Sequence, residues 1–592
     1  MSHTSILDRW ADQVERRAAA PALATAERDW SHRELADLAT GLRARLADGT
    51  GPVLVACADP VPVVAAVLAC AATGRPFAPV DTRQPAARWT AVLEDLDPGT
   101  VLADAPGRAA LAAAGHGELP LLDAESVTPL PWAAGDWRGL TGPDAGYVYF
   151  TSGTTGRPKG IRGGFEAVAH FLDWELAEFA VAPGTRVSML TSPGFDAFLR
   201  DALVPLCAGG TAVLPGPGPI PVGAALGRWL AEQRIELLHC VPTVFRTLRA
   251  AGLTTGSLPG LRAALLAGEP VRPADITWWR GLFGSDKELV NLYGPSETTM
   301  TKVFRRLTAE DAEAETVPAG TPMPGVEVAV LAAGRPVTEA IGEIEIRTPF
   351  PLRGYLAGPG GGFVGTDRYR TGDLGRLRAD GTLEVLGRRD QQVKVNGARV
   401  ELGEIEDLLR RHPGVADLCA ALVEEDDGEP VLCAYLVAAA ATTAGTAAVT
   451  DEELREYAAE GLPAAARPAR YLRLAAIPRT LSGKADRRAL PSPAALAGRT
   501  GEQPLDGLEA GIAELWCELL HLPAVGRHDD FALLGGDSLG IARLLDGLRT
   551  RFGVEVPLRV YVGAPTVAGL AAAVAAGRDG SGDGASPAGE RR

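Results

Sequence analysis

The sequence predicts a layered α/β protein with smaller domains after it in the chain. From the N-terminus to about residue 389, short apolar runs typical of buried strands alternate with helical patterns. Between residues 317 and 389 the runs shorten and turn residues multiply, which predicts a small antiparallel β-subdomain within this region. A shorter α+β pattern and then a helical block follow. The fold class is therefore α/β, with a small α+β subdomain and a helical bundle attached.

The residue types predict where individual strands and helices of the large region lie. Aromatic and branched side chains at 147–150 predict a buried strand, and the first 17 residues predict a charged amphipathic helix without a signal-peptide core. A helix is expected over 62–72. The other expected strands are 54–58, 77–80, 101–103, 187–191, 235–242 and 263–267.

Changes of composition along the chain suggest five segments. The large N-terminal subdomain is expected to span 1–389, and a small mobile α+β subdomain 390–490, with helices over 402–411 and 451–460. A Pro/Gly/Ala-rich linker would cover 491–506. The helical block would span 507–576, and a Gly/Ser/Asp-rich disordered tail 577–592.

Composition excludes several classes of function. The formal net charge of −16 disfavours nucleic acid and anionic membranes as partners. Two long apolar stretches, 53–72 and 430–449, are interrupted by Asp59 and prolines or are only weakly hydrophobic, so neither predicts a membrane span. The seven cysteines are scattered singly and the histidines lack metal-ligand spacing. These features predict reduced cysteines in a cytoplasmic protein without a protein-built metal site.

The loop after the strand at 147–150 has the composition of a polyphosphate site. Glycines let backbone N–H groups approach an anion, hydroxyls add donors, and Lys159 adds a positive charge. A proline before the lysine disfavours helical geometry at Arg157, so the loop is expected to be open and mobile rather than a Walker A loop. A flexible surface loop is the alternative. The candidate ligands are Thr151, Ser152, Gly153, Thr154, Thr155, Gly156 and Lys159.

Further motifs follow this loop in a fixed order. They are Phe-Asp-Ala at 195–197, Asn-Leu-Tyr-Gly-Pro-Ser-Glu-Thr-Thr at 291–299, Tyr-Arg-Thr-Gly-Asp-Leu at 369–374, the segment 387–406, and Leu-Ser-Gly-Lys at 481–484. Together they resemble the adenylation domains of nonribosomal peptide synthetases, in the adenylate-forming (ANL) superfamily, over nearly the whole chain. The resemblance implies that ATP and Mg²⁺ are used to join a carboxylate to AMP, and that the acyl group then passes to a thiol.

The first of these steps needs no general base, because a carboxylic acid is ionised at neutral pH. It needs alignment and neutralisation of charge as the carboxylate attacks the α-phosphate. The resemblance gives this task to Lys484, supported by Lys159, and implies that Glu297 holds Mg²⁺. It also implies that Tyr293 stacks on adenine and that Asn291 hydrogen-bonds the edge of the base.

The resemblance places the ribose at two further residues. Asp373 would accept both ribose hydroxyls, and Arg388 would assist at ribose or phosphate. Two positions depart from the family pattern: Val385 stands where an aromatic residue commonly helps hold the nucleotide, and Asn396 replaces the usual arginine. Neither departure removes a charge that the chemistry needs.

The second step needs a thiol on a long arm. Gly-Gly-Asp-Ser-Leu at 535–539 resembles the carrier domain that receives 4′-phosphopantetheine on Ser538; an ordinary helix N-cap is the alternative. Asp390 matches the family hinge, about which the small subdomain rotates between the two steps. Lys484 would then leave the site, and the segment around Lys394 and Gly397 would face the entering arm.

The substrate is expected to be an L-α-amino acid. Asp196 matches the aspartate that pairs with the α-ammonium group, which needs such a partner in a dry pocket. Arg200, four residues later, would either pair with Asp196 on a helix or bind a side-chain carboxylate or carboxamide. The expected order is serine, then aspartate or asparagine, with proline as an outside candidate. The other matching pocket positions are Ala197, His239, Leu265, Ala267, Leu292, Met300 and Thr301.

Two rival functions remain open on the sequence alone: an acyl- or aryl-CoA ligase that uses free CoA, and a non-catalytic carrier scaffold. The chain shows no His-His-x-x-x-Asp-Gly condensation motif and no Gly-x-Ser-x-Gly thioesterase elbow. The expected partners are therefore a phosphopantetheinyl transferase and a separate condensation or tailoring enzyme, with a small MbtH-like helper protein as a further candidate.

Overall fold

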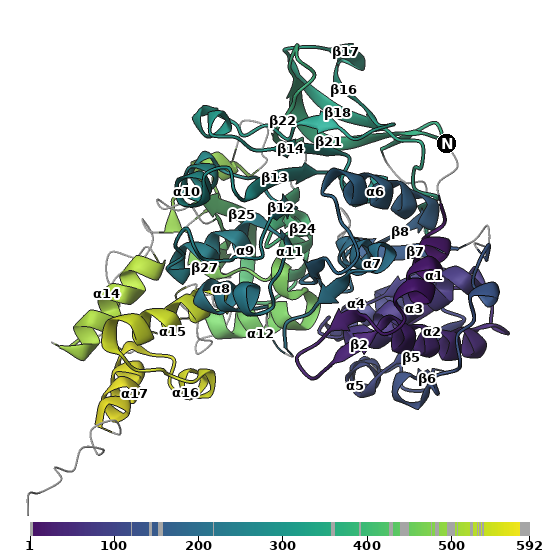
Figure 1. The fold of residues 1–592 in the computed structure, drawn as a ribbon. Coiled ribbons are helices and arrows are strands. Elements are labelled where there is room, and N and C mark those ends of the chain that lie inside the picture. The colour runs from purple at the N-terminus through teal and green to yellow at the C-terminus, as the bar shows by residue number, and fades with distance from the viewer. Residues whose placement is uncertain are drawn as a thin grey trace, which may run out of the picture. The chain divides into compact units, whose positions relative to one another are not determined.

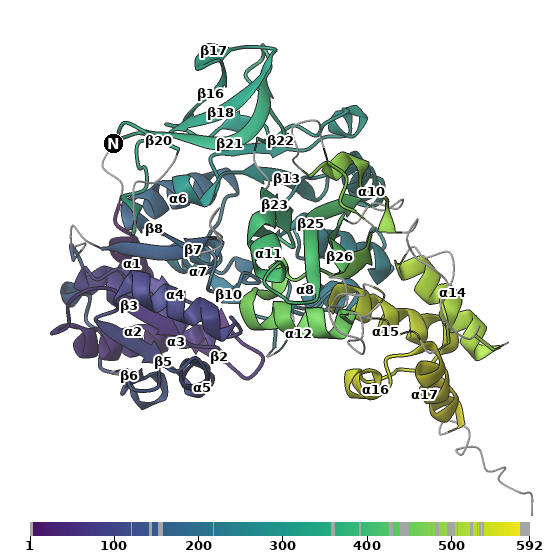
Figure 2. The ribbon, with the colours of Figure 1, turned by 180° about the vertical axis from the view of Figure 1, so that it is seen from behind.

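The computed structural model shows an α/β protein followed by a helical carrier-like region (Figure 1, and from behind in Figure 2). The residues that it describes are 4–119, 121–140, 145–151, 158–216, 218, 220–356, 362–389, 392–424, 430–438, 449–474, 476–479, 485–493, 504–505, 507–520, 525–527, 529, 531, 534 and 538–579.

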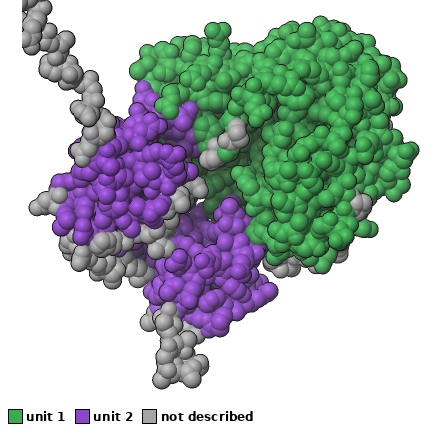
Figure 3. Space-filling model, turned by 90° about the horizontal axis from the view of Figure 1, so that it is seen from below, with its two compact units in different colours: residues 1–221, 226–246, 253–401 green, residues 222–225, 247–252, 402–592 purple. Residues whose placement is uncertain are grey.

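The chain divides into two compact units. The first contains residues 1–221, 226–246 and 253–401, and the second contains 222–225, 247–252 and 402–592 (Figure 3). The sequence places a domain boundary at 389, whereas the division between units falls after Glu401. The predicted hinge, Asp390, lies outside the described residues.

The first unit contains a seven-stranded sheet that carries the predicted phosphate loop. Its order is β19-β8-β7-β4-β3-β5-β6, and the strands from β7 to β6 are parallel. Helices α3 (Pro60–Thr73), α4 (Ala86–Leu96) and α5 (Ala105–Ala113) connect parallel strands. The strands are β3 (Val53–Ala56), β4 (Phe77–Pro79), β5 (Thr100–Ala103), β6 (Leu121–Asp123), β7 (Gly146–Thr151), β8 (Lys159–Gly164) and β19 (Gly354–Tyr355).

A nine-stranded sheet forms the second large layer, in the order β15-β14-β13-β12-β11-β9-β10-β1-β2. Its strands are β1 (Pro21–Ala24), β2 (Asp29–Ser31), β9 (Arg186–Ser188), β10 (Thr211–Val213), β11 (Leu237–Cys240), β12 (Ala263–Ala267), β13 (Glu288–Tyr293), β14 (Val303–Arg306) and β15 (Thr321–Pro322). The remaining helices of this region are α1 (Ile6–Arg17), α2 (His32–Leu46), α6 (Phe165–Glu178), α7 (Ala197–Ala208), α8 (Gly223–Glu232), α9 (Pro242–Thr247) and α10 (Pro273–Phe283).

The main core fills the space around α3, α6 and α7. These helices are buried on nearly every side, and side chains such as Val64, Phe171 and Leu203 belong to one apolar cluster with residues of both sheets. A helix that is apolar all round is expected to be enclosed by other layers. The strands and helices expected in this region are confirmed, although β9 and β11 are shorter than predicted. β11 ends early because Pro242 begins α9, the position at which proline suits a helix.

The predicted antiparallel β-subdomain is confirmed as a six-stranded sheet. It consists of β16 (Glu327–Ala332), β17 (Arg335–Val337), β18 (Ile341–Arg347), β20 (Phe363–Val364), β21 (Arg368–Leu377) and β22 (Leu383–Arg388). A separate hairpin of β23 (Gln392–Val395) and β24 (Ala398–Glu401) follows. Asn396 and Gly397 form its turn with φ of 49° and 77°. The hairpin turn therefore explains asparagine at position 396, because the left-handed region that it occupies favours Asn and Gly.

Within its described residues, the second unit holds a small α+β region and four further helices. β25 (Val415–Glu424), β26 (Pro430–Ala438) and β27 (Arg470–Arg473) form a sheet beside α11 (Leu402–Leu409) and α12 (Asp451–Gly461). The helices of the carrier-like region share a core that includes Trp516, Phe531 and Leu570. They are α14 (Leu508–Leu520), α15 (Ser538–Phe552), α16 (Leu558–Gly563) and α17 (Val567–Asp579). α17 continues into the segment predicted as a disordered tail; residues 580–592 lie outside the described part.

None of the helices in the described part of the chain combines the length and the apolar character that crossing a bilayer requires. All seven cysteines are free thiols, and all but Cys517 are buried, as expected.

Candidate active site

The predicted phosphate loop connects two antiparallel strands. β7 ends at Thr151 and β8 begins at Lys159, and the two residues are register partners. The hydroxyl of Thr151 donates to the Lys159 carbonyl at 3.5 Å. The other predicted ligands, Ser152 to Gly156, lie outside the described residues. The predicted loop segment is therefore flanked by two strands, whereas a Walker A loop runs from a strand to a helix.

Three of the predicted nucleotide ligands form one hydrogen-bonded group. The Tyr293 hydroxyl donates to Oδ2 of Asp373 at 2.5 Å, and Nη1 of Arg388 donates to Oδ1 at 2.6 Å. The register of β21 and β22 places Asp373 opposite Arg388, which accounts for this pair. Burial, with the nearby Asp373 charge, holds the pKa of Tyr293 well above its ordinary value, so its hydroxyl stays a donor. Asn291, two residues earlier on β13, donates from Nδ2 to the Pro318 carbonyl at 2.9 Å.

Glu297 lies in a short 3₁₀ turn and is buried. Its Oε1 accepts from Nη1 of Arg399 at 2.7 Å, whereas its buried Oε2 has no hydrogen-bond partner among the described residues. A buried carboxylate oxygen without a donor fits a cation ligand, and Mg²⁺ prefers oxygen. Within the described residues, no group of three or more His, Cys, Asp or Glu could hold a metal ion. Glu297 would hold a Mg²⁺ ion there, and the ion would supply charge neutralisation when bound.

Asp196 directly precedes α7 and lies beside an unusual stretch of backbone. Its Oδ2 accepts the Met300 N–H at 3.2 Å. Thr299 and Met300 have φ of 65° and 55°, a region that a β-branched residue rarely adopts. The Tyr147 and Thr299 hydroxyls lie 2.7 Å apart, and Nζ of Lys302 donates to the Thr299 carbonyl at 2.8 Å. The surrounding contacts hold a strained turn next to the predicted ammonium site, as is common at functional sites.

Burial perturbs both charged groups of this turn. It raises the pKa of Asp196 above its ordinary value, and the charge of Glu297 adds to this effect. It lowers the pKa of Lys302 to about 7, against the opposing attraction of Asp196. Lys302 is a site residue that the sequence analysis missed. Its signal was its position directly after the pocket residue Thr301 and directly before β14.

Arg200 does not pair with Asp196, which corrects one of the two roles considered for it. Its Nε donates to Oδ1 of Asp201 at 2.9 Å, and Nη2 lies 2.8 Å from the same oxygen. His239 lies between two carboxylates, with Nε2 2.8 Å from Oε1 of Glu175 and Nδ1 3.5 Å from Oδ1 of Asp201. All four residues are buried. We call Glu175, Arg200, Asp201 and His239 the buried charge cluster; sequence reasoning missed Asp201 and Glu175.

The other predicted pocket residues lie on adjacent elements. His239 is the register partner of Leu265, and Ala267 that of Leu292, on three neighbouring parallel strands. Ala197 begins α7, and Met300 and Thr301 precede β14. The structure therefore brings this set together near the carboxyl ends of β11, β12 and β13, the usual place for a ligand in a parallel sheet.

The second unit carries the two remaining predicted sites. Residues 480–484, including Lys484, lie outside the described part, whereas Arg479 and Ala485 on either side form an antiparallel bridge. Ser538 is the first residue of α15, so its backbone is at the N-terminus of a helix.

Comparison with known families supports this reading of the two units. A model described as AMP-binding enzyme matches residues 10–356, AMP-binding enzyme C-terminal domain matches 404–484, and phosphopantetheine attachment site matches 510–574. The fold and the site thus define an adenylate-forming enzyme joined to a carrier domain.

Two relatives match most of this chain. Novobiocin biosynthesis protein H of Streptomyces niveus is 33% identical, with 96% of each chain covered. Phosphinothricin tripeptide synthetase PhsC of Streptomyces viridochromogenes is 34% identical over 96% of this chain, which spans 52% of that relative. Other matched relatives are longer still, and this chain spans only 6% to 8% of three of them.

Solved structures match this chain over most of its length. The structure of holo-PA1221, an NRPS protein containing adenylation and PCP domains bound to a vinylsulfonamide inhibitor, has a TM-score of 0.79, 26% identity and 96% coverage of both chains. The chain belongs to the AMP-binding enzyme family, as an adenylation–carrier didomain of the nonribosomal peptide synthetase type.

Proposed function

We propose that this protein activates an L-α-amino acid as aminoacyl-AMP and loads it onto its own carrier domain for natural-product biosynthesis. The observation that carries the proposal is the buried carboxylate of Asp196 in the same unit as the Tyr293–Asp373–Arg388 group and Glu297. A free acid without an ammonium group gives such a carboxylate no partner. The carrier match around Ser538 supports a thiol acceptor within the chain.

Each residue has a limited task in the proposed reaction. Asp196 binds the ammonium group, Asp373 holds the ribose, and Glu297 holds Mg²⁺. An amino-acid carboxylate oxygen attacks the α-phosphorus of ATP, the bond to the β-phosphate oxygen breaks, and pyrophosphate leaves. Lys484 stabilises the charge that gathers on the phosphate in the transition state. The phosphopantetheine arm, when attached to Ser538, supplies the thiol that accepts the aminoacyl group.

Exchange of labelled pyrophosphate into ATP tests this function. We expect exchange that depends on one or a few L-amino acids. The CoA-ligase alternative is tested in the same assay, with aryl or fatty acids as substrates and free CoA as the acceptor. Exchange with such acids and none with amino acids would overturn the proposal. A chain inactive with both would support the scaffold alternative.

We propose an uncharged polar side chain for the substrate, with serine first and asparagine ahead of aspartate. The guanidinium of Arg200 already contacts Asp201, and Glu175 adds a second buried carboxylate nearby. A third carboxylate, from an aspartate substrate, would meet an arginine whose charge is already balanced. A hydroxyl or carboxamide side chain carries no charge that would need a counter-ion beside these carboxylates.

Arg200→Ala is expected to lower stability and to reduce exchange with every amino acid, because it leaves Asp201 buried without its cation. The expected loss in the free energy of unfolding is about 3–5 kcal/mol. Thermal unfolding and the amino-acid profile of exchange measure the two effects. Arg246→Ala is the matched control, since it breaks another buried ion pair, with Asp275 at 3.1 Å, on α9 and α10, which contain none of the predicted pocket residues. Loss confined to acidic substrates would instead identify Arg200 as a ligand for the substrate side chain.

The pH dependence of amino-acid use is expected to follow Asp196. Only the carboxylate form pairs with an ammonium group, and burial raises the pKa of Asp196 above its ordinary 3.8. The value of kcat/KM for the amino acid should therefore fall as the pH drops toward that raised pKa, earlier than an ordinary aspartate would cause. Asp196→Asn should raise the KM for the amino acid by about 10²-fold and abolish this fall of kcat/KM at low pH. The KM for ATP serves as the control; an equal rise there would contradict the assignment.

We further propose the partners of the loaded carrier. A phosphopantetheinyl transferase would modify Ser538, and a separate condensation or tailoring enzyme would take the aminoacyl group. A small MbtH-like helper protein is proposed as an additional partner, and the cytoplasm as the site of action. Co-expression with such a helper, compared with expression alone, measures its effect on soluble yield and exchange activity.

A further inference from the structure

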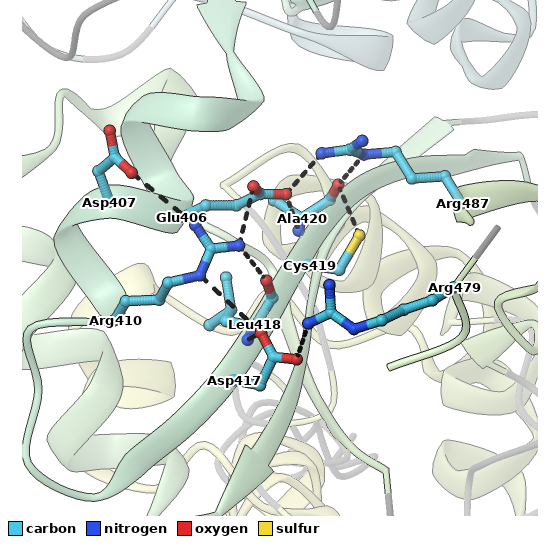
Figure 4. Close-up of polar contacts among 9 residues, drawn as sticks. All are labelled: Glu406, Asp407, Arg410, Asp417, Leu418, Cys419, Ala420, Arg479 and Arg487. Atoms are coloured by element: carbon cyan, nitrogen blue, oxygen red, sulfur yellow. Dashed lines mark hydrogen bonds and ion pairs between the residues drawn. The ribbon is translucent and has the colours of Figure 1, made fainter. Parts of the chain in front are cut away.

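A network of arginines and acids in the second unit surrounds the ends of the segment that contains Lys484. Figure 4 shows this network between α11, β25 and the residues that flank 480–484. We call five of its residues the clasp: Glu406, Arg410, Asp417, Arg479 and Arg487. No motif in the sequence analysis assigns these side chains a role.

Glu406 is the centre of the clasp. Its side chain is 9% exposed, and its Oε1 accepts from Nη2 of Arg487 at 2.6 Å and from the Ala420 N–H at 2.9 Å. Its Oε2 accepts from Nη2 of Arg410 at 3.1 Å. Arg487 also donates from Nε to the Ala420 carbonyl at 2.8 Å. One guanidinium thus binds a helix side chain and a strand carbonyl together, a geometry that its fixed fork of donors favours.

The other end of the segment is attached by a second pair. Nη2 of Arg479 donates to Oδ2 of Asp417 at 2.6 Å, and Oδ1 of Asp417 accepts the Leu418 N–H at 2.9 Å. Nη2 of Arg410 donates to the Leu418 carbonyl at 2.6 Å, so the two halves of the clasp meet on β25.

The backbone closes the base of the segment. Arg479 and Ala485 form an isolated antiparallel bridge, and the Asp486 N–H donates to the Pro478 carbonyl at 2.8 Å. Apolar side chains near this base, including Ile477 and Ala485, already belong to the core of the subdomain. The arginines of the clasp are partly exposed and Asp417 is 30% exposed, so these ion pairs add little net stability compared with apolar packing. The clasp is therefore better suited to fixing the positions of Arg479 and Arg487, on either side of 480–484, than to holding the subdomain folded.

We propose that Glu406 and Asp417 are positioning residues for Lys484, acting through Arg487 and Arg479. This inference rests on the proposed function, in which Lys484 stabilises charge during adenylate formation. A transition state with charge on the α-phosphate is sensitive to small displacements of the cation. Fixing both ends of a short segment to a helix and a strand restricts the positions that a lysine within it can reach.

Glu406→Gln in the full chain tests the proposal. It keeps the size of the side chain and one acceptor, but removes the charge that binds Arg487 and Arg410. We expect single-turnover adenylate formation, with ATP, Mg²⁺ and the amino acid that gives the highest wild-type exchange, to slow about 10-fold to 100-fold. Thioester formation on the holo-carrier from pre-made aminoacyl-AMP should keep its wild-type rate. Asp407→Asn is the matched control, because Asp407 lies on the same helix, is 60% exposed and contacts only Arg410 within the clasp, at 3.8 Å.

A double mutant separates positioning from a general structural effect. If Glu406 acts through Lys484, Glu406→Gln should cause no further loss in a Lys484→Ala background. Equal loss in both half-reactions, a loss that persists without Lys484, or no loss at all would overturn the proposal. Asp417→Asn, at a side chain that is 30% exposed, repeats the test if Glu406→Gln fails to fold.

Hydrogen exchange provides a readout that does not depend on activity. Backbone amides in a peptide spanning 479–487 should exchange faster in Glu406→Gln than in the wild type or in Asp407→Asn. Unchanged protection of these amides in Glu406→Gln would overturn the proposed role of the clasp, whatever the activity of the variant. If the wild type showed no amino-acid-dependent exchange while this protection changed as expected, the proposed function would fail and the anchoring of the segment would stand.

Discussion

Lys484→Ala is expected to slow adenylate formation by about 10²-fold or more, because the charge that gathers on the α-phosphate then lacks its cation. The second half-reaction, attack by the carrier thiol on pre-made aminoacyl-AMP, should keep most of its rate, since Lys484 is proposed to leave the site before that step. Single-turnover measurements of each half-reaction check the two rates separately.

Lys484→Arg is the informative companion variant. It keeps the charge but changes the shape of the donor, so its activity should lie between those of the wild type and Lys484→Ala. An equal loss in both half-reactions for Lys484→Ala would contradict the proposal that the small subdomain rotates about Asp390 between the two half-reactions. Lys484 would then be required for both half-reactions.

Ser538→Ala is expected to abolish covalent loading while amino-acid-dependent pyrophosphate exchange continues. The arm takes no part in adenylate formation, so the two activities should separate completely. Ser538 is the only serine between residues 507 and 576, and it begins α15. Mass spectrometry after incubation with CoA and a phosphopantetheinyl transferase, and then with ATP and the amino acid, measures both the modification and the loading.

Ser581→Ala provides the control for this experiment, because Ser581 follows the carrier region closely in sequence but lies outside the matched residues 510–574. This variant should be modified and loaded like the wild type. Persistent modification of Ser538→Ala would move the attachment site elsewhere in the chain.

Local sequence patterns were sufficient for most of the fold, and three of the nucleotide ligands that they predict lie together in the structure. Tyr293, Asp373 and Arg388 come from three separate motifs. The register of β21 and β22 places Asp373 opposite Arg388, and the Tyr293 hydroxyl reaches Asp373 from β13 of the nine-stranded sheet. Alternating apolar runs and turn residues also predicted the antiparallel subdomain, because strand period and turn chemistry are local properties.

The residues around the expected amino-acid site were harder to predict, because their contacts depend on the tertiary structure. Spacing on a helix suggested Asp196 as the partner of Arg200, but the guanidinium turns to the adjacent Asp201. Glu175 is buried on α6, far from His239 in sequence, so no local pattern could indicate that the two lie together. The subdomain boundary at 389 rests on composition and stays a prediction. The β23–β24 hairpin after it belongs to the first unit, where Gly397 donates to Glu269 at 2.7 Å.

The left-handed turn at Thr299 and Met300 limits how this enzyme could be retargeted by protein engineering. A mutant library at position 300 would sample shape and polarity freely, yet φ of 55° there penalises valine, isoleucine and threonine whatever they contact. Asparagine and glycine fit the backbone without that cost, but glycine would also loosen the N–H that Asp196 accepts. Changes of substrate range are therefore more accessible through the side chains on β11, β12 and β13, where ordinary strand geometry accepts most residues.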